Sequence, residues 1–399
     1  MISVKEAREI IDANTEALLP VEYSLQLAGG KILAEDVYAE MDIPGFPQSS
    51  MDGYAFSFNG WKQNKKLLLE GEIAAGSSDE LSLVPGKAVR IFTGAPVPPG
   101  ADTVIMQEKV TIGFSADDKK EVRIEDEGIR LGINVRPKGS EIKKGELALE
   151  KGSLLSPAAI GFLAGIGISK VKVFPSPVIS IIITGKELQQ PGELLVYGQV
   201  YESNSYMLTA VLQHLHFDAI TIFRVDDDLE TVTRTLSEAL EQSDMVLLTG
   251  GISAGDYDFV LPATVNCGVT KLFHKIKQRP GKPLYFGKKE NKLVFGLPGN
   301  PSSVLTSFYE YVLRALAILT KQQISLPIQY VPLEAPFNKQ VRLTQFLKGF
   351  YNGKTVSILE AQESYRLSSF AKANCLVKLE EEMEECKEGQ IMEIHLLPA

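Results

Sequence analysis

The sequence has few cysteines and histidines, and no long hydrophobic run. Its 399 residues include 3 Cys and 4 His. Cys267, Cys375 and Cys386 form no CxxC pair and have no neighbouring His, which argues against a zinc site or a disulfide framework. Aliphatic segments such as 178–183 are far too short to span a bilayer, and the first residues do not resemble a secretory leader. We therefore expect a cytoplasmic protein with reduced thiols and no membrane partner.

The charge balance is acidic. Against 41 Lys and Arg the chain carries 50 Asp and Glu, which gives a formal net charge of −9. This excess argues against nonspecific nucleic-acid binding, so an anionic ligand would need local cations. The hydrophobic share of 44% and the length predict a chain of several domains with buried cores.

The most informative feature is residues 247–258, LLTGGISAGDYD, in which an apolar strand opens into glycines and carboxylates. Glycines let backbone N–H groups approach a phosphate, and a helix predicted to begin near Tyr257 would add its N-terminal dipole. Acidic residues beside a phosphate suggest a bridging Mg²⁺. The alternative is that the glycines only serve the geometry of a strand-to-helix turn. The candidate ligand-binding residues are Thr249, Gly250, Gly251, Ser253 and Gly255.

A second strand-to-helix turn follows at 296–303, GLPGNPSS, after a predicted strand at 292–297. Asn300 or Ser302 is a suitable N-cap with Pro301 near the first helical position, and the helix is predicted to run to about Thr320. In an open α/β sheet, ligands bind at the carboxyl ends of the strands. Pro298, Asn300 and Ser302 are therefore further candidates for substrate binding.

Cations occur on alternate residues of 275–282, KIKQRPGK. In an extended strand, alternate side chains share one face, which groups Lys275 with Arg279. Together with Lys282 at the end of the same basic segment, they are candidates for anion binding. The alternative is a solvated sheet edge on which lysines prevent strand pairing.

The pattern between about 171 and 320 alternates strands and helices, which predicts a mostly parallel sheet. On both sides the sequence changes to short strands with Gly and Pro turns. This texture predicts a β barrel at about 49–136 and a second β module at 326–399. Amphipathic helices are predicted at 4–19 and from Pro157, with Ser156 as N-cap. We expect these two helices to pack together, which makes the barrel an insertion. The expected elements of the α/β region are strands 178–183, 218–224, 245–249 and 282–286, and helices 204–216, 229–242 and 257–265.

Five ordered motifs resemble the molybdopterin molybdenumtransferases of the MoeA type, a family that includes the gephyrin E domain. The resemblance covers nearly the whole chain, and the motifs are 44–55 (PGFPQSSMDGYA), 90–98 (RIFTGAPVP), 249–258, 279–283 (RPGKP) and 296–302. It implies conversion of adenylyl-molybdopterin and molybdate to molybdenum cofactor, with Mg²⁺ and release of AMP. It also implies a homodimer, with possible contact to the molybdopterin adenylyltransferase.

The resemblance further implies a multidomain α/β plus β architecture. An elongated linker and dimerisation domain of helices and strands would comprise 1–46 and 137–170, interrupted by an inserted β-barrel domain at 47–136. A MogA-like, three-layer α/β domain at 171–325 would bind molybdopterin, and a C-terminal β-barrel domain would occupy 326–399.

The matching motif positions supply candidates for catalysis and metal binding. Glu187 in the segment TGKEL, Asp227 in an Asp triplet and Asp258 would hold the metal, although a helix-start carboxylate or an N-cap would explain the first two. Asp52 and Thr93 join Glu187 and Asp258 as catalytic candidates. Without the resemblance, Asp52 reads equally well as an Asx turn and Thr93 as an ordinary strand residue.

In the last domain, Lys348 and Ser364 match positions that give a basic group and a hydroxyl to a molybdate pocket, and Arg342 lies nearby. The chain departs from the family pattern at Lys348, where Arg is common, at Arg279, where Lys is common, and at Glu141, where Asp is common. A lysine cannot form the bidentate fork of an arginine, so oxyanion affinity or the choice between molybdate and tungstate is left open.

Two alternative functions remain for this sequence. One is a molybdopterin adenylyltransferase, which would need the α/β domain alone, and the other is a catalytically inactive molybdopterin-binding scaffold. The presence of both flanking domains argues against the first. The joint presence of Asp52, Glu187, Asp258, Lys275 and Lys282 argues against the second.

Overall fold

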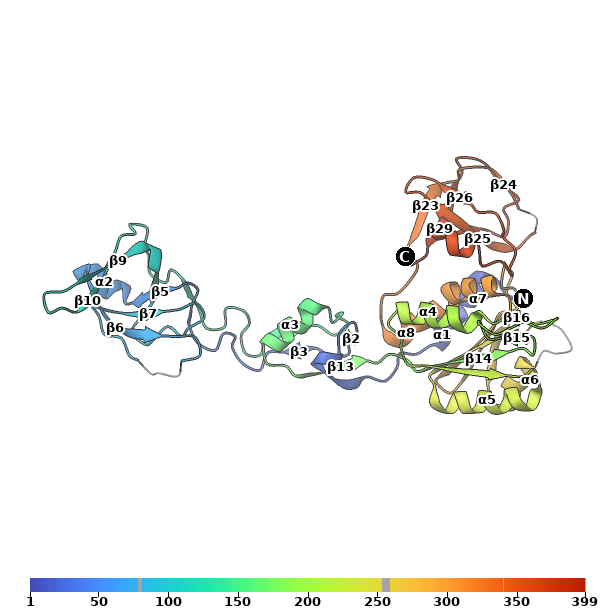
Figure 1. Cartoon of the computed structure of the whole chain (residues 1–399), viewed down its shortest axis with the longest axis horizontal. Coiled ribbons are helices and arrows are strands. Elements are labelled where there is room, and N and C mark those ends of the chain that lie inside the picture. The colour runs from blue at the N-terminus through green and yellow to red at the C-terminus, as the bar shows by residue number, and fades with distance from the viewer. Residues whose placement is uncertain (78–80, 253–258, 340, 399) are drawn as a thin grey trace. The chain divides into compact units, whose positions relative to one another are not determined.

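A computed structural model describes residues 1–77, 81–252, 259–339 and 341–398. The chain forms two compact units (Figure 1). One unit combines Met1–Glu22 with Lys172–Ala399, and the other is Tyr23–Val171. The second unit is therefore an insertion into the chain of the first.

A six-stranded sheet forms the centre of the first unit. The first four strands in its order are parallel to one another. The fifth pairs with both of its neighbours in antiparallel fashion, so it alone runs in the opposite direction. The mostly parallel sheet predicted from the sequence is thus confirmed. The strand order is β17 (Ile220–Val225), β14 (Ile179–Thr184), β18 (Met245–Thr249), β22 (Lys292–Leu297), β21 (Tyr285–Lys289) and β19 (Thr270–His274).

Helices cover both faces of this sheet and make three layers (Figure 1). Successive side chains of a strand point to opposite faces: Ile181 and Ile183 enter one hydrophobic core, whereas Ile182 enters the other. The first core receives α1 (Val4–Asn14), α4 (Asn204–His214), α7 (Pro301–Ser307), a π-helical segment (Phe308–Val312) and α8 (Leu313–Thr320). The second receives α5 (Leu229–Gln242) and α6 (Val260–Asn266).

Helix α1 belongs to the first unit. Ser3 caps it in a capping box with Glu6, and its apolar face enters the core of the α/β layers through Val4, Ala7 and Ile11. The expectation that this face packs against the helix after Ser156 is wrong, because the core of the first unit already covers it. The later helix is formed as expected: α3 (Pro157–Gly165) has Ser156 as N-cap and Pro157 in its first turn.

The C-terminal region has a mixed sheet and a hydrophobic core of its own. Strand β20, which comes from the α/β region, pairs in parallel with β25 and so extends this sheet. The three cysteines are free and buried; burial raises the pKa of the Cys375 thiol to about 12. The sheet order is β20 (Gln278–Arg279), β25 (Thr344–Tyr351), β27 (Cys375–Leu379), β29 (Ile391–Leu396) and β23 (Ile328–Pro332); β26 (Val356–Ile358) pairs with β25, and β24 (Phe337–Asn338) with β28 (Glu385–Cys386).

The second unit contains a mixed six-stranded sheet with helix α2 (Phe58–Asn64) and a core that includes Trp61. Closure of this sheet into a barrel stays a prediction. Its strand order is β8 (Thr103–Met106), β5 (Gly53–Phe56), β7 (Lys87–Ile91), β6 (Leu67–Ile73), β10 (Lys120–Ile124) and β9 (Val110–Phe114). Small sheets elsewhere are β1 (Val21–Ser24) with β13 (Lys170–Phe174) and β2 (Ile32–Leu33); β3 (Val37–Tyr38) with β12 (Leu147–Leu149); β4 (Gln48–Ser49) with β11 (Val135–Arg136); and β15 (Leu188–Gln189) with β16 (Val200–Tyr201). Within the described ranges, every helix is too short or too polar to cross a membrane.

Candidate functional site

A cavity of about 690 Å³ lies in the first unit, where the parallel strands β14, β18 and β22 end. The starts of α4 and α7 both contribute to its wall, as do Tyr365 and Leu367 of the C-terminal region. Ligand sites of open α/β sheets form at this edge. The cavity collects seven of the site residues predicted from the sequence: Glu187, Asp227, Thr249, Gly250, Gly251, Pro298 and Asn300.

The glycine turn after β18 needs its glycines for close approach. Gly250 has φ of +90°, and a Cβ there would lie 2.7 Å from the carbonyl oxygen of Thr184 and 2.8 Å from its Oγ1. The geometric interpretation of this turn therefore holds, and the same backbone also lines the cavity. The helix predicted from Tyr257 begins at Val260; Ser253, Gly255 and Asp258 lie outside the described residues.

The described wall of the cavity is acidic. Its charged side chains are Glu187, Glu202 and Asp227, and no Lys or Arg occurs among the lining residues within the described ranges. Lys275, Arg279 and Lys282 are thus absent from this wall, although Pro283 belongs to it. The cations inferred from the sequence do not line this cavity.

The basic segment is also not the regular strand that we predicted. Lys275 has φ of +71°, which breaks extended geometry, and only Gln278–Arg279 are in a strand. Exposure still alternates, because Ile276 and Gln278 are fully buried while the basic residues are not. Lys277 pairs with Glu381, with Nζ and Oε1 3.2 Å apart. The segment is a turn that connects two sheets rather than a continuous basic face.

Asp227 and Asp228 of the Asp triplet occupy different places in the structure. Asp228 caps α5 by accepting a hydrogen bond of 2.9 Å from the backbone N–H of Thr231, which lowers the pKa of its carboxyl group. Capping, which the sequence favoured for the triplet, is confirmed for this residue. Asp227 instead lines the cavity with Glu187. In the described ranges, no cluster of three or more His, Cys, Asp or Glu is placed to hold a metal ion.

The loop that carries Ser364 is joined to the start of α7. Asn300 donates through Nδ2 to Ser364 Oγ at 2.9 Å, and the backbone N–H of Ser302 donates to the Ser364 carbonyl at 3.0 Å. Three of the predicted binding residues therefore lie together, beside the cavity wall formed by Asn300 and Pro301.

The ammonium group of Lys348 is held by contacts within the C-terminal region. Its side chain is buried, and Nζ donates to the carbonyl oxygens of Ala361 at 2.8 Å, Arg366 at 3.2 Å and Glu363 at 3.4 Å. Burial lowers its pKa. Because an ammonium group has three N–H donors, these three carbonyls can use all of them, and Lys348 holds the loop that carries Ser364. Its role in binding an oxyanion stays a prediction. Arg342 is also engaged, 2.7 Å from Glu384.

Two lining residues escaped the sequence analysis. Glu202, which is buried, accepts hydrogen bonds from the backbone and hydroxyl of Ser205 in the first turn of α4. Asn204 donates through Nδ2 to the carbonyl of Gly299 at 2.9 Å. The sequence held a signal for them, because α4 begins shortly after a strand, as α7 does. The predicted start of helix 204–216 could therefore have been included among the candidate ligand sites.

Asp52 and Thr93 lie together in the second unit. The Asp52 carboxylate accepts hydrogen bonds from the backbone N–H and the hydroxyl of Thr93, each 2.8 Å long. These bonds lower the pKa of the Asp52 carboxyl group. An Asx turn joins residues two apart, whereas these are 41 apart, so the local interpretation of Asp52 is wrong. Glu141 belongs to the same unit and is exposed.

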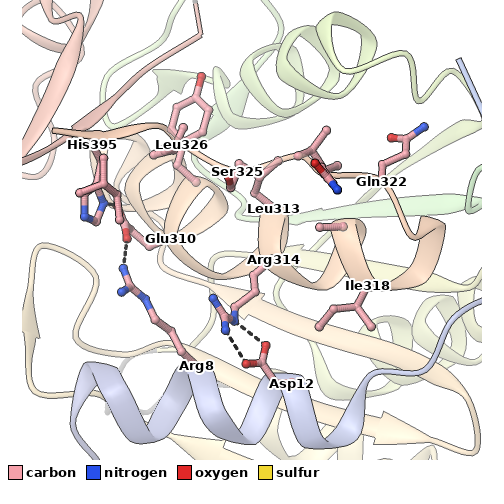
Figure 2. A pocket seen from close by; sticks show the side chains of 15 residues that line it. Arg8, Asp12, Glu310, Leu313, Arg314, Ile318, Gln322, Ser325, Leu326 and His395 are labelled. Atoms are coloured by element: carbon pink, nitrogen blue, oxygen red, sulfur yellow. Dashed lines mark hydrogen bonds and ion pairs between the residues drawn. The ribbon is translucent and has the colours of Figure 1, made fainter. Parts of the chain in front are cut away.

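A second cavity, of about 570 Å³, lies beside α1 and α8 and contains none of the predicted site residues (Figure 2). One end of it is an ionic network. His395 contacts Glu310 through Nδ1 at 2.7 Å and Glu393 through Nε2 at 2.9 Å, and Arg8 pairs with Glu310. Burial alone would lower the pKa of His395, but the hydrogen bonds and charges of the two glutamates raise it. The network joins α1, the π-helical segment and β29.

Comparison with known proteins identifies relatives over the whole chain. Residues 2–167 match the MoeA N-terminal region (domain I and II), 180–318 a probable molybdopterin binding domain, and 330–397 the MoeA C-terminal region (domain IV). The molybdopterin molybdenumtransferase of Haemophilus influenzae is 33% identical over 415 residues and covers 100% of both chains. That of Staphylococcus aureus strain Mu50 is 32% identical over 405 residues, covering 99% of this chain and 95% of its own.

Solved structures of MoeA proteins are also similar to this chain over its whole length. Two structures of a molybdopterin biosynthesis MoeA protein from Pyrococcus horikoshii superpose with TM-scores of 0.83 and 0.73, at 28% and 30% identity, and each covers 100% of both chains. The similarity in sequence and in structure therefore extends from end to end.

Proposed function

Because the chain belongs to the MoeA family of molybdopterin molybdenumtransferases, we propose that it inserts molybdenum from molybdate into adenylyl-molybdopterin with release of AMP. The chain is a transferase of molybdenum cofactor biosynthesis. The observation that carries the detailed reaction is the cavity at the strand ends, most of whose wall lies within the residues matched as a probable molybdopterin binding domain.

The chain's own groups suit a phosphorylated substrate at this place. Gly250 and Gly251 line the cavity without side chains, and the positive ends of the dipoles of α4 and of the helical segment from Pro301 lie at the same wall. These dipoles favour phosphate oxygens without adding a mobile charge. Release of AMP breaks a phosphoanhydride bond, and groups preorganised for the developing negative charge accelerate such a step.

The donor set of the cavity fits Mg²⁺. Magnesium in phosphoryl-transfer sites is held by one or two carboxylates, with water and substrate phosphates as the other ligands, and Glu187 and Asp227 line one wall. We propose that these two residues, with Asp258, hold Mg²⁺. When bound, the ion would neutralise phosphate charge in an otherwise acidic cavity.

We also propose a homodimer and a catalytic role for Asp52. The carboxylate of Asp52 is exposed and ionised, and Thr93 fixes its orientation with two hydrogen bonds. An oriented, exposed carboxylate in this state is suited to a polar substrate atom or to a metal-bound water. Light scattering at micromolar concentration tests the dimer, and a monomeric mass would refute it.

The experiment that tests the function measures AMP release from adenylyl-molybdopterin by the purified full chain. Molybdate and Mg²⁺ are each present or absent, and the product is used to activate an apo molybdoenzyme. We expect AMP release that needs both additions and yields active enzyme. Formation of adenylyl-molybdopterin and diphosphate from ATP and molybdopterin would instead indicate an adenylyltransferase, and binding without turnover an inactive scaffold.

A matched pair of variants makes the metal proposal specific. Glu187→Gln should raise the Mg²⁺ concentration for half-maximal AMP release about tenfold or more, because a carboxamide is a weaker ligand for a hard cation. Glu193→Gln, an exposed residue outside the cavity wall, should leave it unchanged. Equal Mg²⁺ requirements in the two variants would remove Glu187 from the metal site. Replacing molybdate by tungstate in the same assay measures oxyanion preference.

A further inference from the structure

Two described residues of the cavity wall each hold a buried polar oxygen without a hydrogen-bond partner. Within the described ranges, Asn204 Oδ1 and Thr249 Oγ1 are inaccessible to solvent and unpartnered, and both residues line the wall. Asn204 is 8% exposed and Thr249 1%. Buried polar groups are nearly always satisfied in folded proteins, so an unpartnered atom at a cavity wall points to a group that arrives with the ligand.

The orientation of the Asn204 carboxamide is fixed by its other end. The carbonyl of Gly299 can only accept a hydrogen bond, so the atom 2.9 Å from it must be the Nδ2 donor. This assignment leaves Oδ1 as the free end. The contact joins the start of α4 to the turn before α7, so the acceptor is held by two elements of the cavity wall.

The surroundings of this acceptor select the chemistry of its partner. A carboxamide oxygen repels phosphate oxygens, and the charged side chains described in the same wall, Glu187, Glu202 and Asp227, are all acidic. A neutral N–H donor satisfies Asn204 Oδ1 without a charge conflict, and the Thr249 hydroxyl can donate or accept beside it.

We infer that Asn204 is a specificity-determining residue that accepts a hydrogen bond from an amino group on the heterocycle of the substrate. The inference rests on the proposed function, since adenylyl-molybdopterin carries two such heterocycles: the 6-aminopurine of the adenylyl group and the 2-amino-substituted pterin. Both offer the same chemistry, an amino group on a planar ring, and the test below separates them.

The test uses paired ligands that differ at the amino group. AMP is compared with purine riboside 5′-monophosphate, and pterin-6-carboxylate with lumazine-6-carboxylate, by equilibrium binding to the full chain with EDTA present. In the wild-type protein, we expect loss of the amino group to weaken binding about tenfold or more for one pair, because the buried acceptor is then left unsatisfied. Asn204→Leu should bind both members of that pair equally.

Two further variants separate recognition from structure. Thr209→Val, which removes another buried, unpartnered hydroxyl on α4 outside the cavity wall, should discriminate as the wild type does. Asn204→Asp keeps an oxygen acceptor but loses the donor to Gly299, so it should retain discrimination even where overall affinity falls. If Asn204→Leu fails to fold, Asn204→Ala decides the matter, because it also removes the acceptor and should bind both members of the pair equally.

Discrimination confined to the AMP pair assigns Asn204 to adenine, and discrimination confined to the pterin pair assigns it to the pterin. Wild-type protein that binds both members of each pair equally overturns the inference, as does discrimination that survives in Asn204→Leu. Failure of the proposed function would look different: the wild type would release no AMP in the presence of molybdate, whatever the paired ligands show.

Discussion

Replacing His395 by leucine should destabilise the first unit in a pH-dependent way. The imidazole contacts two carboxylates, Glu310 at 2.7 Å and Glu393 at 2.9 Å, and its side chain is only 3% exposed. Its pKa is raised above the ordinary value of 6.5 by these glutamates, against the effect of burial. Below pH 6.5 the ring is therefore an imidazolium, and it joins the π-helical segment to β29 through Glu310 (Figure 2).

The size of the effect follows from what leucine leaves behind. Breaking a buried ion pair costs about 3–5 kcal/mol. Each carboxylate keeps one other cation, Arg8 for Glu310 and Lys378 for Glu393, so we take the lower end, about 3 kcal/mol. With a urea m-value of about 3 kcal/mol per molar for a unit of this size, the unfolding midpoint should fall by about 1 M.

The pH dependence has a definite sign. Because the folded-state pKa of His395 is raised, its stabilisation is fully present below the unfolded value of 6.5 and is lost as pH rises through the folded-state pKa. The difference between wild type and variant should therefore be largest at about pH 6 and shrink at alkaline pH, towards the roughly 1 kcal/mol of ordinary hydrogen bonds.

The assay has an internal control, because the only tryptophan of the chain, Trp61, is buried in the core of the second unit. Urea unfolding is followed by tryptophan fluorescence for the second unit and by far-ultraviolet circular dichroism for both. The variant should shift the dichroism transition and leave the Trp61 transition in place. A difference in midpoint that stays constant from pH 6 to pH 9 would refute the charged state assigned to His395, and an unchanged midpoint would refute the network's contribution to stability.

Three other substitutions test the candidate site. Gly250→Ala should lower AMP release at least tenfold and destabilise the first unit by roughly 2 kcal/mol, because its Cβ would clash with backbone; Gly251→Ala, whose nearest neighbour would be 3.3 Å away, should cost less in both urea unfolding and activity. Lys348→Met should lower the free energy of unfolding by about 2 kcal/mol without raising the KM for molybdate. The exposed control Lys354→Met should change neither quantity. A raised KM without loss of stability would instead support Lys348 as an oxyanion ligand. Asp52→Asn should reduce AMP release at least tenfold with an unchanged thermal midpoint, and normal turnover would exclude its charge from catalysis.

The sequence predicted the α/β layers well because their signals are local. Strand 245–249 and helix 229–242 have the predicted bounds, since an apolar run or a 3.6-residue period carries its own information about burial. Helix α4 ends two residues before the predicted His216, which has a positive φ. The predictions succeeded where the residues that decide the structure are neighbours in the chain.

Predictions failed where the deciding contact comes from a distant segment. The amphipathic pattern of α1 showed that one face is buried but not which core receives it, and that face packs in the α/β layers. The alternation of 275–282 ignored the turn at Lys275, whose backbone N–H donates to Leu284 and whose carbonyl accepts from Ile2. An amphipathic period specifies that a face is covered, whereas its partner depends on tertiary packing.

Residue type alone was also a poor guide to which side chains of the candidate site are available to a ligand. Lys348 was assigned to oxyanion binding from its place in a motif, which could not show that its burial gives it backbone carbonyls as partners. Conversely, Asn204 carries no charge and attracted no attention, although its fixed carboxamide leaves a buried acceptor at the cavity wall. A polar side chain can recognise a ligand when folding leaves one of its donors or acceptors without a hydrogen-bond partner. Which groups are left in this state is decided only when all elements of the wall have packed together. Residue type therefore identifies which groups are able to bind a ligand, and only the hydrogen-bond inventory of the folded chain identifies which of them are free to do so.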